Sequence, residues 1–187
     1  MTKTLLYYGL AGAVCLLSAC KKSDLDPNGL PKATQEGKGT AGWLLDGKAW
    51  VPAKSSISTG PPVNGFWRKT KGGHSLGVSF SQFSVQESWG ADFFLPDIRQ
   101  PGTFVLNQVP AITIGLNNTS YGQYYHSRPA PDIDCYTGPD APGTLIITRF
   151  DTIQNIVSGT FEMSPRDAGT GEAVQITQGR FDLHFDR

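Results

Sequence analysis

A long segment near the middle of the chain gathers the side chains best suited to binding a ligand. Residues 117–142 interleave tyrosines with charged residues and prolines. Long segments of this composition often carry function. Tyrosine offers wide amphipathic contact at little entropic cost, and arginine is a planar donor for carboxylates and hydroxyls. We therefore predict a ligand-binding set made of Tyr121, Tyr124, Tyr125, His126, Arg128 and Tyr136.

A second interpretation of the same tyrosines is structural. Tyr124, Tyr125 and Tyr136 could cap an open end of the hydrophobic core, because buried aromatic rings are ordinary core components. The two interpretations predict different results for substitution of Tyr124, Tyr125 and Arg128 by alanine. A contact surface would lose ligand capture at nearly constant melting temperature, whereas a cap over the core would lose stability.

Three aspartates in this segment raise the question of a metal site. Asp132, Asp134 and Asp140 follow His126 closely, and calcium prefers oxygen ligands of this kind. Their spacing matches no known metal-binding loop, and turns favour aspartate for hydrogen bonds to its own backbone. We expect no metal and no cofactor, and these three aspartates are the candidate ligands if a metal does bind.

Motifs of known enzyme classes are missing from the sequence. There is no Gly-x-Ser-x-Gly elbow, no His-Glu-x-x-His helix and no phosphate-binding glycine loop before a helix. We therefore assign no catalytic residue. Two enzymatic alternatives stay open, namely a hydrolase that uses His126 with nearby aspartates, and a nucleophilic pair of Cys135 with His126.

The overall charge argues against a nucleic-acid partner. The chain has 16 Lys and Arg residues against 16 Asp and Glu residues, and its basic cluster, Arg68-Lys69-Lys71, lies in a glycine-containing turn. Nucleic-acid binding needs a basic patch or stripe.

The folded region begins with a hairpin. Asp46-Gly47 stands between two apolar runs, which is a strong short-range signal for a two-residue turn with positive φ at both positions. Trp43 then faces Trp50 across the hairpin, and we interpret this pair as core.

Short apolar and alternating runs continue to the C-terminus and predict many antiparallel strands. We expect a bulge near Gln82, where the apolar parity changes after Phe80, and a second bulge near Gly179. The pattern predicts one all-β domain over residues 40–187, an antiparallel β-sandwich, with a flattened, lipocalin-like β-barrel as the alternative. The other expected strands are Leu76–Phe80, Trp89–Leu95, Phe104–Leu106, Ile112–Leu116, Tyr121–Tyr125, Ile133–Tyr136, Leu145–Phe150, Ile156–Met163 and Val174–Phe185.

The N-terminus has the pattern of a secretory leader. Lys3 precedes an apolar run from Leu5 to Leu17 that is too short to span a bilayer as a mature helix. We predict a signal peptide over residues 1–19. The polar stretch from Lys21 to Gly39 predicts a flexible tether.

The motif Leu17-Ser18-Ala19-Cys20 resembles the lipobox of bacterial lipoproteins. The resemblance implies diacylglycerol on the Cys20 sulfur, cleavage before Cys20 and acylation of the new amine. It implies a cell-envelope protein, lipid-anchored to the outer membrane on its periplasmic or cell-surface side. The alternative is a secreted protein in which Cys20 occurs by chance. Because Cys15 leaves with the leader and Cys20 carries lipid, Cys135 has no partner for a disulfide within the chain.

Residues 34–187 are similar to a widespread family of Bacteroidetes-type lipoproteins of unknown function. The similarity is carried by the opening hairpin and by the runs at 143–151, 155–162 and 176–182. No catalytic residue of that family is assigned. The triplet Asp151-Thr152-Ile153 resembles the O-glycosylation motif of exported proteins of the same type, which makes Thr152 a candidate glycosylation site.

These observations together predict a monomeric, membrane-anchored binding module. Its expected partners are the membrane, through lipid on Cys20, and a glycan or an envelope protein. The alternatives are the hydrolase and a structural envelope component without a small ligand.

Overall fold

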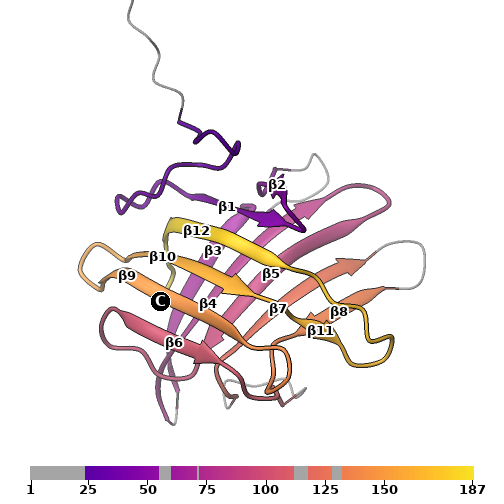
Figure 1. Ribbon diagram of the computed structural model, residues 1–187. Helices are drawn as coiled ribbons and strands as arrows, with labels where there is room; N and C mark the ends of the chain where they lie inside the picture. Colours follow the sequence, from indigo (N-terminus) through magenta and orange to yellow (C-terminus); the bar gives the residue numbers. More distant parts are fainter. Residues whose placement is uncertain (1–23, 55–59, 71, 112–117, 128–131) are drawn as a thin grey trace, which may run out of the picture.

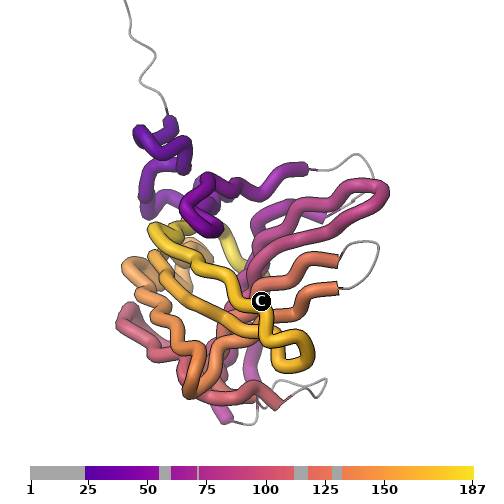
Figure 2. The backbone as a smooth tube through the Cα atoms, turned by 45° about the vertical axis from the view of Figure 1, so that its right-hand side comes forward, coloured from indigo at the N-terminus to yellow at the C-terminus, as the bar shows by residue number. Residues whose placement is uncertain are grey.

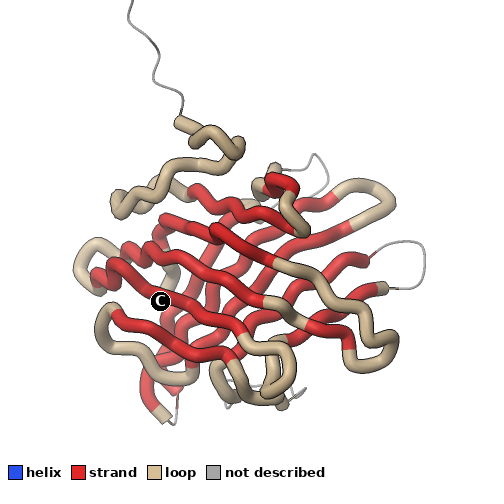
Figure 3. The backbone as a smooth tube through the Cα atoms, in the orientation of Figure 1, coloured by secondary structure: helices blue, strands red, loops and turns tan. Residues whose placement is uncertain are grey.

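The computed structural model describes residues 24–54, 60–70, 72–111, 118–127 and 132–187. They form two six-stranded antiparallel sheets that pack face to face as a β-sandwich (Figures 1 and 2). Strands and loops account for all of this part of the chain (Figure 3). The predicted sandwich is confirmed, and the barrel alternative is wrong for these residues because the two sheets do not close on each other. The described residues contain no helix with the length and apolar character needed to cross a membrane.

The first sheet has the order β2-β1-β12-β10-β9-β6. Its strands are β1 (Thr40–Leu45), β2 (Lys48–Trp50), β6 (Gly102–Leu106), β9 (Gly143–Asp151), β10 (Ile156–Met163) and β12 (Ile176–His184). The second sheet has the order β11-β8-β7-β5-β4-β3. Its strands are β3 (Val63–Thr70), β4 (Gly73–Phe83), β5 (Ser88–Leu95), β7 (Tyr121–Ser127), β8 (Ile133–Tyr136) and β11 (Arg166–Asp167).

The first hairpin forms as its sequence predicts. Asp46 and Gly47 have φ values of 48° and 79°, the left-handed geometry of a tight hairpin turn. Trp43 and Trp50 are cross-strand partners whose rings stack with their centroids 3.9 Å apart. Trp43 is fully buried and also contacts Phe80 of the second sheet. The tryptophan pair is therefore core, and it helps to join the two sheets.

One of the two predicted bulges forms. Pairing of β12 with β10 changes register between Phe161 and Met163, next to Gly179. The left-handed residue is Gln178, at φ 54°, while Gly179 provides space, because a Cβ there would lie 2.4 Å from the Phe161 ring.

The bulge near Gln82 is wrong. β4 pairs with β5 without interruption as far as Phe83. The apolar side chains beyond Gln82 are exposed instead, with Phe83 at 37% and Val85 at 86%. The strand has run past the end of the core at this point, and single exposed apolar side chains are common on protein surfaces.

The segment before the sandwich corrects the expectation of a flexible tether. Residues 24–39, which we call the strap, pack along β1 and β12. Leu30 is fully buried, and Asp26 forms an ion pair of 2.9 Å with Arg180 of β12. Gly42 of β1 leaves room for this packing, since a Cβ there would lie 2.8 Å from the Pro31 ring. The strap lies at the end of the sandwich where the described part of the chain begins (Figures 1 and 2).

The strap is held by the carboxylate of Asp182, which points outward from β12. Its oxygens accept hydrogen bonds from the Thr34 hydroxyl at 2.6 Å, the Gly37 amide at 2.7 Å and the Ser158 hydroxyl at 2.7 Å. The amides of Glu36 and Lys38 donate to it at 3.0 and 3.2 Å. Burial opposes ionisation of this group, but these hydrogen bonds outweigh it and lower the pKa of Asp182 to about 2.

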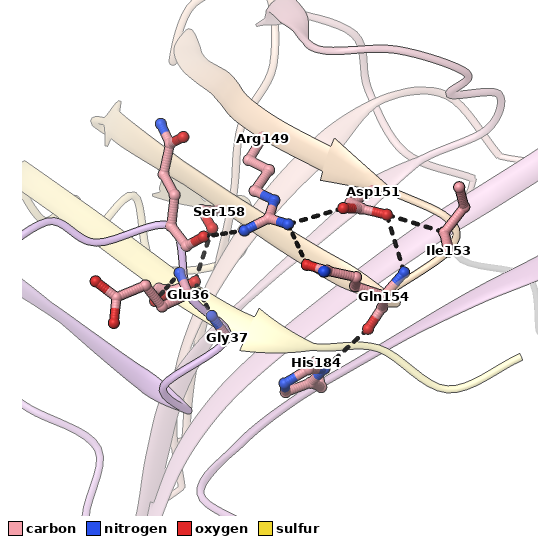
Figure 4. A network of polar contacts seen from close by, with 10 residues as sticks. Glu36, Gly37, Arg149, Asp151, Ile153, Gln154, Ser158 and His184 are labelled. Atoms are coloured by element: carbon pink, nitrogen blue, oxygen red, sulfur yellow. Dashed lines mark hydrogen bonds and ion pairs between the residues drawn. The ribbon is translucent and has the colours of Figure 1, made fainter.

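Arg149 of β9 adds a second attachment beside Asp182. Its guanidinium donates to the backbone carbonyl of Gln35 in the strap, and it also binds Asp151 at 2.7 Å and the Gln154 side chain. Figure 4 shows these contacts converging between the strap and the β9–β10 turn. We call Asp182, Arg149 and their strap partners the clamp.

Candidate functional site

The outer face of the second sheet carries ordered rows of polar and aromatic side chains. Strand register places Asn64, Ser79, Asp92, Gln123 and Tyr136 side by side across β3, β4, β5, β7 and β8. Each of these five residues is at least partly exposed. Because their neighbours along each strand point into the core, the whole row faces outward. It combines two amides, a hydroxyl, a carboxyl group and a phenol.

Aromatic rings flank this polar row on both sides. On one side the register aligns Phe66, Gly77, Phe94 and Tyr121, and the Phe94 and Tyr121 rings stack at 5.8 Å. On the other side lies Tyr125, which pairs with Gly90. The Phe66 ring lies over Gly77, where a Cβ would come within 2.3 Å of it. We call this surface, the polar row and its aromatic flanks, the tyrosine face.

Asp92 stands at the centre of the tyrosine face. Burial raises the pKa of Asp92 to about 6, a hydrogen bond from Ser79 opposes the rise, and the negative charge of Asp134 adds to it. Its Oδ1 atom is enclosed and has no hydrogen-bond partner among the described residues. An enclosed acceptor without a donor costs stability. Asp92 is therefore a carboxyl group whose hydrogen-bonding capacity is not filled by the protein around it.

The phenols around Asp92 remain protonated donors at neutral pH. Burial, followed by the charge of Asp92, raises the pKa of Tyr125 to about 12. The same two causes raise the pKa of Tyr121, with Asp134 contributing, and burial together with Asp134 raises that of Tyr136. The Tyr136 hydroxyl donates to Asp134 Oδ2 at 3.1 Å, and the Gln123 amide donates to the other oxygen of Asp134. Gln123, Tyr136 and Asp134 are thus joined by hydrogen bonds at one end of the face.

The structure separates the predicted ligand-binding residues into two groups. Tyr121, Tyr125 and Tyr136 lie together on the tyrosine face. Tyr124 points the other way and is only 4% exposed, so the structural interpretation holds for Tyr124. His126 also points inward, with its ring 5.3 Å from that of Trp89. Arg128 lies outside the described residues, as do Cys20, residues 1–19 and the expected strand Ile112–Leu116.

The candidate metal ligands are not gathered into one site. Asp132 accepts a hydrogen bond from Ser127 at 3.2 Å, Asp134 holds Gln123 and Tyr136, and Asp140 lies exposed in a turn. Among the described residues, no group of three or more His, Cys, Asp and Glu side chains is placed to hold a metal ion.

The proposed hydrolytic residues do not converge either. His126 and Asp134 belong to opposite faces of the second sheet, and the acidic neighbour of His126 is Glu87, at 3.6 Å. Cys135 is fully buried with its sulfur 3.6 Å from the Glu172 carbonyl, and burial raises the pKa of Cys135 to about 11. A buried thiol of this kind behaves as a small apolar side chain.

Sequence reasoning missed the central residues of the tyrosine face. Asn64, Ser79, Asp92 and Gln123 are ordinary polar positions in alternating strands, and only the register across four strands makes them a row. Thr152 lies in the β9–β10 turn, where its carbonyl accepts a hydrogen bond from Arg187. Its glycosylation stays a prediction.

The outer face of the first sheet has a different character. A groove of about 480 Å³ lies over β9, β10 and β12 beside Ala33 of the strap. Its lining includes Thr144, Ile146, Thr160 and Glu162, and the one aromatic residue that borders it, Phe161, is buried in the core. This groove is a natural control surface for experiments on the tyrosine face.

Comparisons with protein-family models, curated proteins and solved structures found no match to this chain.

Proposed function

We propose that this protein is an envelope lipoprotein, anchored by lipid on Cys20, whose tyrosine face binds a glycan. The observation that carries the proposal is the polar row centred on Asp92 with aromatic rings on both sides. The lipid anchor is supported by the resemblance of Leu17–Cys20 to a lipobox.

A glycan fits this surface for two chemical reasons. The apolar CH faces of a sugar ring pack on aromatic rings, and Phe66, Tyr121 and Tyr125 supply these beside the polar row. Sugar hydroxyls both donate and accept hydrogen bonds, which suits a row that mixes carboxyl, amide and phenol groups. Five neighbouring strands span about 19 Å, at about 4.8 Å between strands, so the row is long enough for an extended oligosaccharide.

The strap shows how an outward carboxylate on this sandwich is saturated. Asp182 accepts hydrogen bonds from hydroxyl and amide donors of the strap, whereas Asp92 accepts one from Ser79 and its Oδ1 atom has no donor among the described residues. The Asp92 side chain is partly exposed but its Oδ1 atom is enclosed, so a sugar hydroxyl would reach Oδ1 only after the neighbouring side chains move aside. It would then supply the kind of donor that Thr34 supplies to Asp182.

The test is a glycan-array screen with residues 24–187, which keep the strap. We expect binding that falls at least tenfold in the double variant Tyr121→Ala/Tyr125→Ala. The matched control, Ile146→Ala/Thr160→Ala, alters the outer face of the first sheet and should bind as the natural chain does. Equal loss in both variants, or loss only in the control, would contradict the assignment of the site.

A screen with no glycan binding would direct attention to the other two roles. Capture of an envelope protein that depends on Tyr121 and Tyr125 would keep the tyrosine face as the site and change the ligand. Absence of both would favour a structural envelope component.

A further inference from the structure

We propose that the strap fixes the domain against the membrane, with the β1–β2 edge of the first sheet next to the lipid surface and β6 turned away from it. The inference rests on the proposed anchor at Cys20, and it adds an orientation that the anchor alone does not give.

Few residues separate Cys20 from the strap. At the start of the strap the Lys32 amide donates to the Asp24 carbonyl at 3.0 Å and Leu25 pairs with Pro31. Cys20 precedes Asp24 by four residues. Four residues of fully extended chain span about 14 Å. A lipid on Cys20 would therefore lie within about 14 Å of the ordered strap, whatever conformation the connecting residues adopt.

The strap is firmly attached to the sandwich. Leu30 is fully buried, Asp26 is paired with Arg180, and Asp182 receives four hydrogen bonds from strap residues. Asp182 also accepts a hydrogen bond from the Ser158 hydroxyl of β10, which ties the strap to the first sheet. The strap therefore moves with the sandwich, and the connection between Cys20 and the sandwich cannot become longer unless the clamp opens.

The strap lies at the β1–β2 edge of the first sheet. The strap runs beside β1 and approaches β2, because a Cβ on Gly29 would lie 3.7 Å from that of Ala49. Strand order places β6 five strands away from β2, at the opposite edge of the first sheet. Five steps of about 4.8 Å separate these edges by about 24 Å. Figure 1 shows the strap and β2 at one end of the molecule and β6 at the other.

The experiment measures two distances in the full lipidated protein reconstituted in phospholipid vesicles. Lys48→Cys on β2 and Thr103→Cys on β6 place one exposed thiol at each edge. Cys135 is buried and stays unlabelled. Energy transfer from each label to headgroup-labelled lipid should put residue 48 closer to the lipid surface than residue 103 by about 20 Å. Equal distances for the two labels would overturn the orientation.

A matched variant tests whether the short connection is the cause. Ten Gly and Ser residues inserted between Ser23 and Asp24 leave the strap and clamp intact but add about 17 Å of average reach. The difference between the two labels should then fall to less than half. An unchanged difference would show that the short connection does not set the orientation.

Failure of the anchor itself is recognised separately, by the intact mass of the protein. A protein without lipid mass would overturn the proposed anchor and this inference with it. A lipidated protein with equal label distances would overturn the orientation alone.

Discussion

Two aspartates, on the outer faces of opposite sheets, have opposite surroundings. Asp182 of the first sheet is covered by the strap and receives five hydrogen bonds, and its pKa falls to about 2. Asp92 of the second sheet keeps an enclosed oxygen without a partner among the described residues, and its pKa rises to about 6. Both carboxyl groups lose water on folding, so the difference comes from the donors that replace it. The hydrogen bonds to Asp182 hold the strap on the sandwich, whereas Asp92 keeps one oxygen without a donor, which is the feature on which the proposed binding site rests.

The largest expected effect on stability is that of replacing Asp182, the carboxylate that accepts five hydrogen bonds. Asp182→Asn removes the charge that five donors share and leaves several of them unpaired, so we expect about 3 to 5 kcal/mol lower unfolding free energy at pH 7. Urea unfolding of residues 24–187 measures it. In the natural chain this contribution is present above pH 4 and is lost as the pH falls toward 2, because the folded-state pKa of Asp182 is lowered. An unchanged urea midpoint would show that the clamp does not stabilise the fold.

Replacing Asp92 should change the unfolding free energy in the opposite direction. The folded-state pKa of Asp92 is raised to about 6 from an ordinary value of 3.8, so its contribution to stability is greatest below pH 3.8 and is lost as the pH rises through 6. Asp92→Asn should therefore stabilise the domain at pH 8, by about 3 kcal/mol at most, with little change at pH 4. The same variant should lose ligand. Unfolding free energies at the two pH values decide the matter, and clear destabilisation at pH 8 would contradict the description of Asp92.

A smaller effect compares two hydroxyl donors. Ser158→Ala removes one donor from Asp182, and Ser79→Ala removes the donor to Asp92. Each should cost about 1 kcal/mol at pH 8. At pH 5 the cost of Ser79→Ala should shrink because Asp92 takes up a proton, whereas the cost of Ser158→Ala should persist. Equal pH dependence in the two variants would mean that Asp182 and Asp92 do not differ in the pH at which they ionise.

A reductant is expected to have no effect on the stability of the domain. Cys135 is free and buried, so dithiothreitol should leave the melting temperature of residues 24–187 unchanged. The clamp and the core then hold the domain together without a disulfide. Because Cys135 is the single cysteine of this fragment, a reductant-dependent fall in the melting temperature would mean that its sulfur is joined to a second chain or to a small thiol, and so is not buried as described.

Local signals in the sequence were sufficient for much of the fold. Asp46-Gly47 predicted its turn because two consecutive left-handed residues restrict the choice of amino acids. The bulge near Gly179 was visible as a change of apolar parity. The same reasoning was wrong near Gln82, because exposed apolar residues such as Val85 imitate a parity change once a strand leaves the core.

The strap could not be predicted, because its partners are distant in the chain. Its polar composition is typical of flexible segments. Thr34 and the amides that follow it are ordered by Asp182, about 145 residues later. One carboxylate accepts hydrogen bonds from several backbone amides of the strap. The amino-acid composition of the strap gives no sign that such an acceptor lies beside it.

The candidate site was predictable only in part. Tyr121, Tyr125 and Tyr136 attracted attention through their composition, and strand alternation already required Tyr124 and Tyr125 to point to opposite faces. Asp92 gave no such signal. Its position depends on the pairing of β5 with β4 and β7, which the sequence of β5 alone does not reveal.

The most direct test of the tyrosine face is an NMR titration of residues 24–187 with oligosaccharides released from the envelope of the same cells. Chemical shifts should change at Asp92, Gln123 and Tyr125, while those of Asp182 and Ser158 in the clamp stay constant. Changes confined to the clamp or to the groove around Thr160, with none on the tyrosine face, would contradict the assignment of the binding site.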